Sequence, residues 1–294
     1  MKKNYKLPSI DLLDKINHKD ATYVPFKLVT ASIPKECLDN KLVLPLGIDN
    51  DGNTNYFDLG KCNNLLIGGT TGSGKSVFLN SIICSVLMRS KPNEVQLLLI
   101  DTKELEFPFY NGIPHLMSPS IAYPKKASIG LQRVVKEMER RYETLSYYSN
   151  VKNIEEYNKT NNIKMPYILV IIDELSDLML ICQNEIEDSF RWITEKGKDV
   201  GIHLIVSTQK PSPRLIDILN STNDLTRISF MATPTDLNTT IGMKAKEKPS
   251  IKGEMLFRPY GTDNIKMIVG PYVSEQEIIK LVGACASQQE ININ

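Results

Sequence analysis

Residues 63–89 read NNLLIGGTTGSGKSVFLNSIICSVLMR, and this stretch decides the fold. Residues 63–67 form a short apolar run of the kind that is typical of a buried strand, and glycines follow it. Residues 74–89 repeat apolar side chains at helical spacing, which predicts a helix. Between the two, Gly69 to Ser76 match the pattern GxxxxGK(S/T) at every specified position. The stretch therefore predicts a strand, a phosphate-binding loop and a helix in succession.

The chemistry of a triphosphate explains the residue types in this loop. Backbone N–H groups must surround the phosphates, and glycine permits the tight turn because it lacks Cβ. The following helix adds free N–H groups and a dipole that favours an anion. We expect Lys75 to reach the β- and γ-phosphates of ATP and Ser76 to ligate Mg²⁺. An ordinary glycine-rich turn between a strand and a helix is the alternative. The residues predicted to bind the nucleotide are Gly69, Thr70, Thr71, Gly72, Ser73, Gly74, Lys75, Ser76 and Val77.

Two adjacent carboxylates follow a second buried run, ILVII at residues 168–172. Ligands of open α/β sheets bind at the carboxyl ends of the strands, which is where Asp173 and Glu174 are predicted to lie. We expect Asp173 to bind Mg²⁺, and Glu174 to orient or deprotonate the water that attacks the γ-phosphate. The alternative is a solvated turn after a strand.

Polar residues also end two other predicted strands on the same rim of the sheet. Gln209 follows the run at 203–207 and is a candidate sensor of the γ-phosphate or of the attacking water. A polar residue that simply ends the strand is the alternative for Gln209. Asp101 follows the run at 95–100 and is equally compatible with a structural role.

Short apolar runs alternate with longer amphipathic ones along most of the chain, which predicts an α/β fold. Its central sheet should be mostly parallel and covered by helices on both faces. We divide the chain into an irregular N-terminal arm, residues 1–40, and an ATPase motor domain, residues 41–294. Besides the elements above, strands are expected at 41–47, 55–59, 226–231 and 255–257, and helices at 126–148, 185–196 and 275–282.

Composition excludes several classes of function. The formal net charge of the 294 residues is +1, which is less basic than usual for a protein that binds DNA by bulk electrostatics. Five scattered cysteines without a CxxC pair argue against a disulfide framework or a zinc site, and favour a reducing, cytoplasmic compartment. No apolar run reaches the roughly 18 residues that span a bilayer, and no signal peptide is evident. We therefore expect no intrinsic membrane span.

Several stretches of the sequence, taken together, resemble the motor domain of the FtsK/SpoIIIE family of DNA translocases. The resemblance covers about residues 41–282, and its phrases include LLIGGTTGSGKSVFLNSII, LLLIDTKELEF, YILVIIDELSDLM, GIHLIVSTQKPS and KGEMLFRP. It implies a RecA-like P-loop NTPase that forms hexameric rings of identical subunits, with ATP at the subunit interfaces and double-stranded DNA through the centre. It also implies a motor trimmed of ring-forming, winged-helix and membrane modules, as a phage, plasmid or conjugative element would encode.

The resemblance further implies residues that act across subunits or on DNA. Lys198 stands where the family has an arginine that completes the neighbouring subunit's site, and lysine lacks the planar donor geometry of arginine. Arg227 matches a second family arginine, and a surface arginine at a strand is its alternative. Lys210 occupies a basic DNA-facing position, and Arg214 or the basic run at 244–248 could add to it. Three positions that are commonly basic in the family are uncharged here: Ser221, Thr235 and Asn238.

Three functions are compatible with these residues. The first is an ATP-driven translocase that moves double-stranded DNA as a hexamer. The second is a coupling ATPase that passes single-stranded DNA or a protein to a membrane or secretion-channel partner. The third, suggested by the lysine at position 198, is a nucleotide-gated assembly protein with little turnover.

Overall fold

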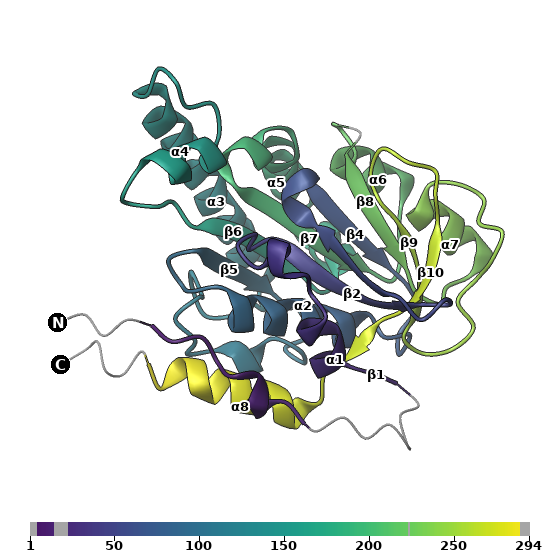
Figure 1. The fold of residues 1–294 in the computed structure, drawn as a ribbon. Helices are drawn as coiled ribbons and strands as arrows, with labels where there is room; N and C mark the ends of the chain where they lie inside the picture. Colours follow the sequence, from purple (N-terminus) through teal and green to yellow (C-terminus); the bar gives the residue numbers. More distant parts are fainter. Residues whose placement is uncertain (1–4, 15–22, 223, 289–294) are drawn as a thin grey trace.

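The computed structural model describes residues 5–14, 23–222 and 224–288, and Figure 1 shows its fold. One large mixed sheet runs through the molecule in the strand order β3-β2-β10-β9-β8-β4-β7-β6-β5. Its strands are β2 (Val43–Asp49), β3 (Thr54–Asp58), β4 (Asn64–Gly68), β5 (Val95–Ile100), β6 (Tyr167–Ile172), β7 (Ile202–Thr208), β8 (Leu225–Ser229), β9 (Glu254–Arg258) and β10 (Lys266–Val269).

The two halves of this sheet differ in strand direction. Strands β5, β6, β7, β4 and β8 pair in parallel. Strands β8, β9, β10, β2 and β3 pair antiparallel. The predicted α/β fold is confirmed, but the sheet is mixed rather than mostly parallel as predicted, and its parallel half contains the strands that precede the motifs. The antiparallel half arises because β2–β3 and β9–β10 are each joined by a short connection, which favours hairpin pairing.

Helices cover both faces of the sheet (Figure 1). Alternate side chains of a strand point to opposite faces, so Leu65 and Ile67 join one core and Leu66 joins the other. Helices α1 (Phe26–Ala31), α2 (Lys75–Arg89) and α8 (Glu275–Ala286) pack into the first core. Helices α3 (Pro124–Ser146), α4 (Ile154–Thr160), α5 (Leu175–Lys196) and α6 (Pro213–Leu219) pack into the second, and α7 (Pro234–Ile241) packs on β9.

Helix α5 begins ten residues before the helix predicted at 185–196. Its first half carries Leu180 and Ile181, which are 84% and 63% exposed. Apolar residues on the solvent side obscure the helical period, so the prediction placed the start too late. The backbone also kinks at Cys182, where φ is −130° and ψ is 44°.

The N-terminal residues pack against C-terminal elements. Strand β1 (Val24–Pro25) pairs in parallel with β11 (Pro271–Tyr272). The segment 5–14 runs beside α8 (Figure 1), and Asp14 forms an ion pair of 2.8 Å with Lys280. The division into an arm and a motor domain at residue 41 stays a prediction. Short 3-10 helices occur at Ile10–Leu12, Lys35–Cys37, Leu59–Lys61, Pro108–Tyr110 and Lys198–Val200.

No helix within the described ranges is both long enough and apolar enough to pass through a bilayer.

Candidate active site

The glycine-rich loop between β4 and α2 forms a concave cradle. Gly69 and Gly74 have φ of +150° and +119°, which favours glycine at both positions. A Cβ on Gly69 would lie 2.8 Å from Phe230 Cβ and from Ser73 Oγ, closer than packed atoms allow. Gly74 is the residue before α2, so the unpaired N–H groups of the first helical turn face this loop. The loop therefore offers backbone donors to an anion.

Lys75 lies inside the cradle. Its Nζ donates hydrogen bonds to Gly69 O at 2.6 Å and to Thr70 O at 2.9 Å. Burial lowers the pKa of Lys75, while the nearby Glu174 and Asp173 carboxylates raise it. The Lys75 ammonium is buried close to the concave side of the loop. It therefore favours the binding of an added anion there, such as a phosphate.

Asp173 ends β6 beside the cradle and is an acid whose charge is poorly compensated. Burial and, to a smaller extent, the carboxylates of Asp101, Glu106 and Glu174 together raise the pKa of Asp173 to about 7, against the lowering effect of Lys75. A divalent cation would reverse that shift. The donors therefore fit Mg²⁺, which commonly takes one or two protein oxygens and completes its shell with phosphate and water. Asp173 and Ser76 line the same hollow, so the Asp173 carboxylate and the Ser76 hydroxyl are the protein oxygens that would hold the ion.

Glu174 is fixed between the ends of β6 and β7. Its Oε1 accepts a hydrogen bond from Thr208 Oγ1 at 2.9 Å, and its two oxygens accept from Gln209 N at 3.2 and 3.1 Å. It also caps α5 by accepting from Ser176 N at 3.3 Å and from the Ser176 hydroxyl. These contacts orient the carboxylate. Sequence reasoning missed Thr208 and Ser176, although both lie directly beside predicted site residues.

The cradle, the two acids and Gln209 meet in one hollow of about 250 Å³, which we call the cradle hollow. Gln209 also contacts the loop directly, because Thr71 Oγ1 donates to Gln209 Oε1 at 2.9 Å. The residues that line the cradle hollow are Thr71, Gly72, Gly74, Lys75, Ser76, Val77, Lys103, Leu105, Glu106, Asp173, Glu174, Gln209 and Lys252. Of the predicted nucleotide-binding residues, Gly69, Thr70 and Ser73 belong to the same loop but are not among the residues that line the hollow.

Asp101 has a structural part in this arrangement. Its carboxylate accepts from the backbone N–H groups of Lys103 at 3.1 Å, Glu106 at 2.8 Å and Phe107 at 3.1 Å. These bonds organise the loop after β5, which brings Lys103 and Glu106 to the cradle hollow. Sequence reasoning did not single out either residue, because no local pattern shows where a loop returns.

Lys198 and Arg227 do not lie at the cradle. Lys198 precedes β7, forms an ion pair of 3.9 Å with Asp224 and lies 5.8 Å from the Tyr260 ring centroid. Arg227 and Arg258 are directly opposite each other on β8 and β9 and line a hollow of about 370 Å³, together with Tyr260. We call this the amino-edge hollow, because it lies toward the amino ends of the parallel strands. The predicted action of Lys198 and Arg227 would therefore require a second copy of the chain.

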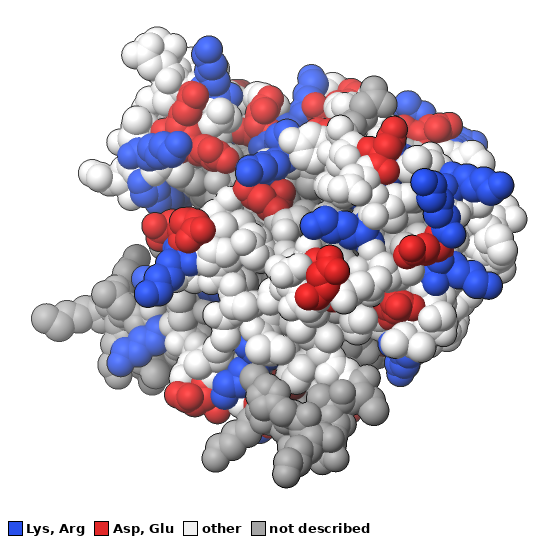
Figure 2. Space-filling view, turned by 45° about the vertical axis from the view of Figure 1, so that its right-hand side comes forward, with Lys and Arg blue, Asp and Glu red and all other residues white. Residues whose placement is uncertain are grey.

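The predicted DNA contacts, Lys210 and Arg214, follow β7 on the outside of the molecule. Lys210 is exposed, and its backbone N donates to Thr208 Oγ1 at 3.1 Å. Arg214 pairs with Glu187 at 2.8 Å while its side chain stays 63% exposed. On the face shown in Figure 2, Lys and Arg side chains are interspersed with Asp and Glu.

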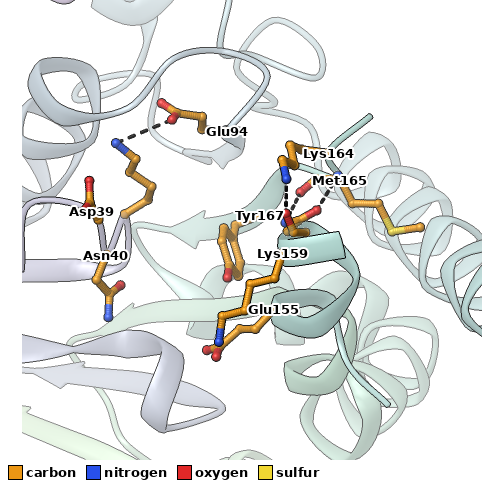
Figure 3. Close-up of a pocket in the computed structure, with 10 residues that line it drawn as sticks. Asp39, Asn40, Glu94, Glu155, Lys159, Lys164, Met165 and Tyr167 are labelled. Atoms are coloured by element: carbon orange, nitrogen blue, oxygen red, sulfur yellow. Dashed lines mark hydrogen bonds and ion pairs between the residues drawn. The ribbon is translucent and has the colours of Figure 1, made fainter. Parts of the chain in front are cut away.

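The largest hollow described here, about 420 Å³, lies at the opposite edge from the cradle, near the starts of β5 and β6 (Figure 3). Two of the lysines that line this hollow already have partners in it: Lys41 pairs with Glu94 at 3.5 Å, and Lys164 donates to the Asn158 carbonyl. Size therefore does not identify the active site, whereas the convergence of motifs in the smaller cradle hollow does.

The fold and this cradle together define a P-loop protein of the α/β class. More specifically, the chain belongs to the FtsK/SpoIIIE family, whose model matches residues 32–162 and 159–213. The DNA translocase SpoIIIE of Bacillus subtilis (strain 168) is 40% identical over 286 residues, which cover 94% of this chain and 36% of that protein. The DNA translocase FtsK of Oceanobacillus iheyensis is 40% identical over 285 residues, covering 91% of this chain and 36% of the relative. The chain thus spans little more than a third of these relatives.

Solved structures of P-loop ATPases share the fold. The pCW3 conjugation coupling protein TcpA superposes with a TM-score of 0.73 at 24% identity, over 90% of this chain and 75% of TcpA. The cytoplasmic domain of the Thermomonospora curvata type VII secretion ATPase EccC gives a TM-score of 0.71 at 23% identity, over 83% of this chain and 31% of EccC. At these identities the similarity establishes the fold alone.

Proposed function

We propose that the protein is an ATP-driven DNA translocase that hydrolyses ATP to move double-stranded DNA. The observation that supports it most is the meeting of Lys75, Asp173 and Glu174 in one hollow at the carboxyl ends of parallel strands. The relatives named as DNA translocases share 40% identity with this chain, which supports DNA translocation as the proposed activity. The free cysteines of the described residues are compatible with work in a reducing cytoplasm.

In this proposal, each residue of the cradle hollow has a separate part in hydrolysis. The loop N–H groups and Lys75 bind the phosphates, and Ser76 and Asp173 would hold Mg²⁺. Bound Mg²⁺ would neutralise charge on the β- and γ-phosphates. Glu174 accepts the proton of the attacking water, and Thr208 and the Gln209 backbone orient the carboxylate for that step. Gln209 contacts the loop through Thr71, so it links the phosphate site to the end of β7.

The amino-edge hollow supports an assembly of several copies. Lys198, Arg227 and Arg258 gather at the edge of the sheet opposite the cradle, so they cannot reach the nucleotide bound to their own subunit. A head-to-tail arrangement places the amino edge of one copy against the cradle of the next, and such contacts close into rings when the rotation allows. We propose a homo-hexamer in which these cations act in trans, a role worth roughly 10³–10⁵ in rate in other phosphoryl-transfer enzymes.

DNA contact in this proposal depends on a few local cations. The net charge of +1 and the mixed charges in Figure 2 give no broad basic surface on the face shown. Lys210 and Arg214 come shortly after Gln209 in the segment that follows β7, so DNA bound to them would lie near the nucleotide sensor. Arg214 shares its charge with Glu187, and this pairing weakens its contribution to phosphate binding.

The test is an ATPase assay without DNA, with single strands and with long duplex, combined with a particle mass in the same buffer. The proposal expects stimulation by duplex and the mass of a hexamer. Preferential stimulation by single strands would favour a coupling ATPase. Tight ATP binding with almost no turnover under any condition would instead indicate a nucleotide-gated assembly protein.

A further inference from the structure

The loop after β5 presents two exposed side chains at the border of the cradle hollow. Glu104 is exposed, and Leu105 is 67% exposed and lines that hollow. The backbone of Glu104 has a φ of +55°, the one positive value at a non-glycine position among the described residues. Such a conformation costs energy and persists only where the surroundings impose it. The loop thus holds an acidic and an apolar side chain outward at a cost in backbone energy.

Neighbouring contacts hold this loop in place. The Asp101 carboxylate accepts hydrogen bonds from three backbone N–H groups of the loop. Phe107 is fully buried, and Asn80 Nδ2 donates to the Glu106 carboxylate at 3.1 Å. Both sides of the segment 104–105 are therefore anchored, so its two side chains are presented from a rigid base.

Glu104 differs from the other acids around the cradle hollow. Asp177 accepts a hydrogen bond from Thr102 Oγ1 at 3.3 Å and lies 4.0 Å from Lys103 Nζ. By contrast, no described residue forms an ion pair or a hydrogen bond with the Glu104 carboxylate. Glu104 is therefore free to bind a cation outside its own chain. The remaining acids are buried or half-buried: Asp101, Glu106, Asp173 and Glu174.

The amino-edge hollow has the complementary charge. Arg227 is 7% exposed, and its Nη1 donates to Thr240 O at 3.0 Å, while no described residue accepts from its Nε or Nη2. A Cβ on Gly242 would lie 3.0 Å from Arg227 Cζ and 3.1 Å from Arg258 Nη1, so the two guanidinium groups border the same spot. Burial and, to a smaller extent, Arg258 lower the pKa of Arg227. A buried cation with unused donors beside a second cation favours the binding of a carboxylate.

One acid already contacts this hollow. Arg258 Nη2 pairs with an Asp263 oxygen at 2.7 Å, and the Asp263 side chain is 79% exposed. Solvent screens an ion pair of this kind, so it compensates little of the charge. Two arginines and one aspartate line the hollow, and one more carboxylate would neutralise it.

We propose that Glu104 of one copy binds the two arginines of the amino-edge hollow in the next copy. The inference rests on the head-to-tail assembly proposed above, and it names the loop that makes the contact. Leu105 would then pack against the Tyr260 ring, which lines the same hollow and is 40% exposed.

This contact would also set the position of Lys198. Its Nζ lies 5.8 Å from the Tyr260 ring centroid, at the side of the amino-edge hollow. Glu104 lies between two residues that line the cradle hollow, Lys103 and Leu105. Docking of the loop would therefore bring Lys198 to the border of the neighbouring nucleotide site.

An exchange of charge between the two sides tests the contact. Particle mass is measured against protein concentration, with Mg²⁺ and a non-hydrolysable ATP analogue. Glu104→Arg and Arg258→Glu should each raise the concentration for half-assembly by roughly tenfold or more, because each places like charges together. The double variant should recover most of the assembly, because the same charges then face each other in exchanged positions. Glu104→Gln, which removes the charge without reversing it, should have an intermediate effect.

The controls separate assembly from folding and from nucleotide binding. Glu139→Arg makes the same charge change at an exposed position on α3 and should assemble as the unaltered chain does. Glu104 does not line the cradle hollow, so Glu104→Arg should bind the analogue with unchanged affinity. Arg258 also donates to Ile241 O and Thr262 O, so thermal unfolding checks that its variants are folded. The two Glu104 variants do not depend on that check.

Three results would overturn this contact alone. They are assembly of Glu104→Arg at the concentration of the unaltered chain, a folded double variant that assembles no better than Glu104→Arg, and an equal loss of analogue binding and assembly in Glu104→Arg. The last would mean that the loop supports the cradle rather than an interface. If the unaltered chain bound the analogue but remained a single copy, the proposed assembly would fail and this contact with it. Absence of duplex-stimulated hydrolysis would contradict the translocase proposal but leave the charge exchange valid.

Discussion

At the scale of single residues, the Glu174 carboxylate is oriented by hydrogen bonds that the sequence did not predict. Thr208, Ser176 and the Gln209 backbone all donate to it. Glu174→Gln keeps the size of the side chain but removes the basic oxygen. We expect ATP binding to persist while hydrolysis falls by about 10²–10⁴, the usual contribution of a general base. Single-turnover hydrolysis and equilibrium binding, measured on the same sample, check both parts. Normal turnover would remove Glu174 from this role.

The raised pKa of Asp173 predicts how the stability of the protein depends on pH when no nucleotide or Mg²⁺ is bound. Its pKa is raised to about 7 in the folded chain, chiefly by burial, whereas an unfolded aspartate titrates near 4. Between these values the folded state binds more protons than the unfolded state, so the free energy of unfolding should decrease as pH rises from about 4 to 7. The decrease should amount to a few kcal/mol, at about 1.4 kcal/mol per unit of pKa.

Urea unfolding at a series of pH values measures this effect. Asp173→Asn removes the titrating group, so its free energy of unfolding should decline less over the same range. Equal slopes in the two proteins would show that Asp173 does not titrate there. Because Mg²⁺ favours the ionised carboxylate, its binding at pH 6 should also release protons from the unaltered protein and not from Asp173→Asn.

At the scale of elements, the connection from β4 to α2 depends on one crowded glycine. A Cβ on Gly69 would lie 2.8 Å from two neighbouring side-chain atoms, and φ there is +150°. Gly69→Ala should therefore displace the loop, weaken ATP binding at least tenfold and cost about 1–3 kcal/mol of stability. Gly72 is the matched control, because it has φ of +75° and open space around its Cβ position. Gly72→Ala should cost only about 1 kcal/mol. Thermal unfolding and ATP binding distinguish the two.

The predictable elements are those whose signal is local. The strand, loop and helix of residues 63–89 are contiguous, so periodicity and glycine spacing located them within one or two residues of β4 and α2. Helices α4, α6 and α7 have only seven or eight residues, too few for a clear helical period. The pairing of β10 with β2 joins segments more than 200 residues apart, which no local pattern shows.

The residues of the candidate site also fall into a predictable group and a group that local sequence patterns do not show. Asp173, Glu174 and Gln209 directly follow strand ends, and Lys75 begins the helix after β4, so the rule for parallel sheets predicted their meeting. Lys103, Glu106 and Lys252 reach the cradle hollow on loops, and the position of a loop depends on tertiary contacts such as the hydrogen bonds to Asp101. Their charge alone did not distinguish them from solvated surface residues.

At the scale of the whole molecule, the separation of cradle and amino edge predicts complementation between subunits. Lys198→Ala should bind ATP normally but hydrolyse it at least tenfold more slowly, because the cation is missing from the adjoining site. Lys75→Ala should lack its own nucleotide but retain Lys198. Mixed rings of the two should recover activity that neither variant has alone, measured as ATPase rate against mixing ratio.

Lys196→Ala is the matched control for this experiment, since Lys196 lies two residues away and contacts the Trp192 ring at 4.5 Å. It should hydrolyse ATP at the normal rate. If mixtures of Lys198→Ala with Lys75→Ala stayed inactive although both entered the same particle, Lys198 would have no role in trans.

The contact between the N-terminal segment and the residues at the end of α8 has a consequence for the order in which the segments of the chain can be connected. Lys6 N donates to Gln288 Oε1 at 2.7 Å, and Gln288 Nε2 donates to Lys6 O at 2.9 Å, so the two ends of the described chain meet. Neighbouring ends and exposed hairpin tips are the conditions under which circular permutation succeeds. A polypeptide opened at the exposed Gly52, where an added Cβ would meet no atom within 4 Å, with a linker between Lys6 and Gln288, should preserve this packing. The position of a break in the backbone is thus separable from the three-dimensional architecture of the described residues.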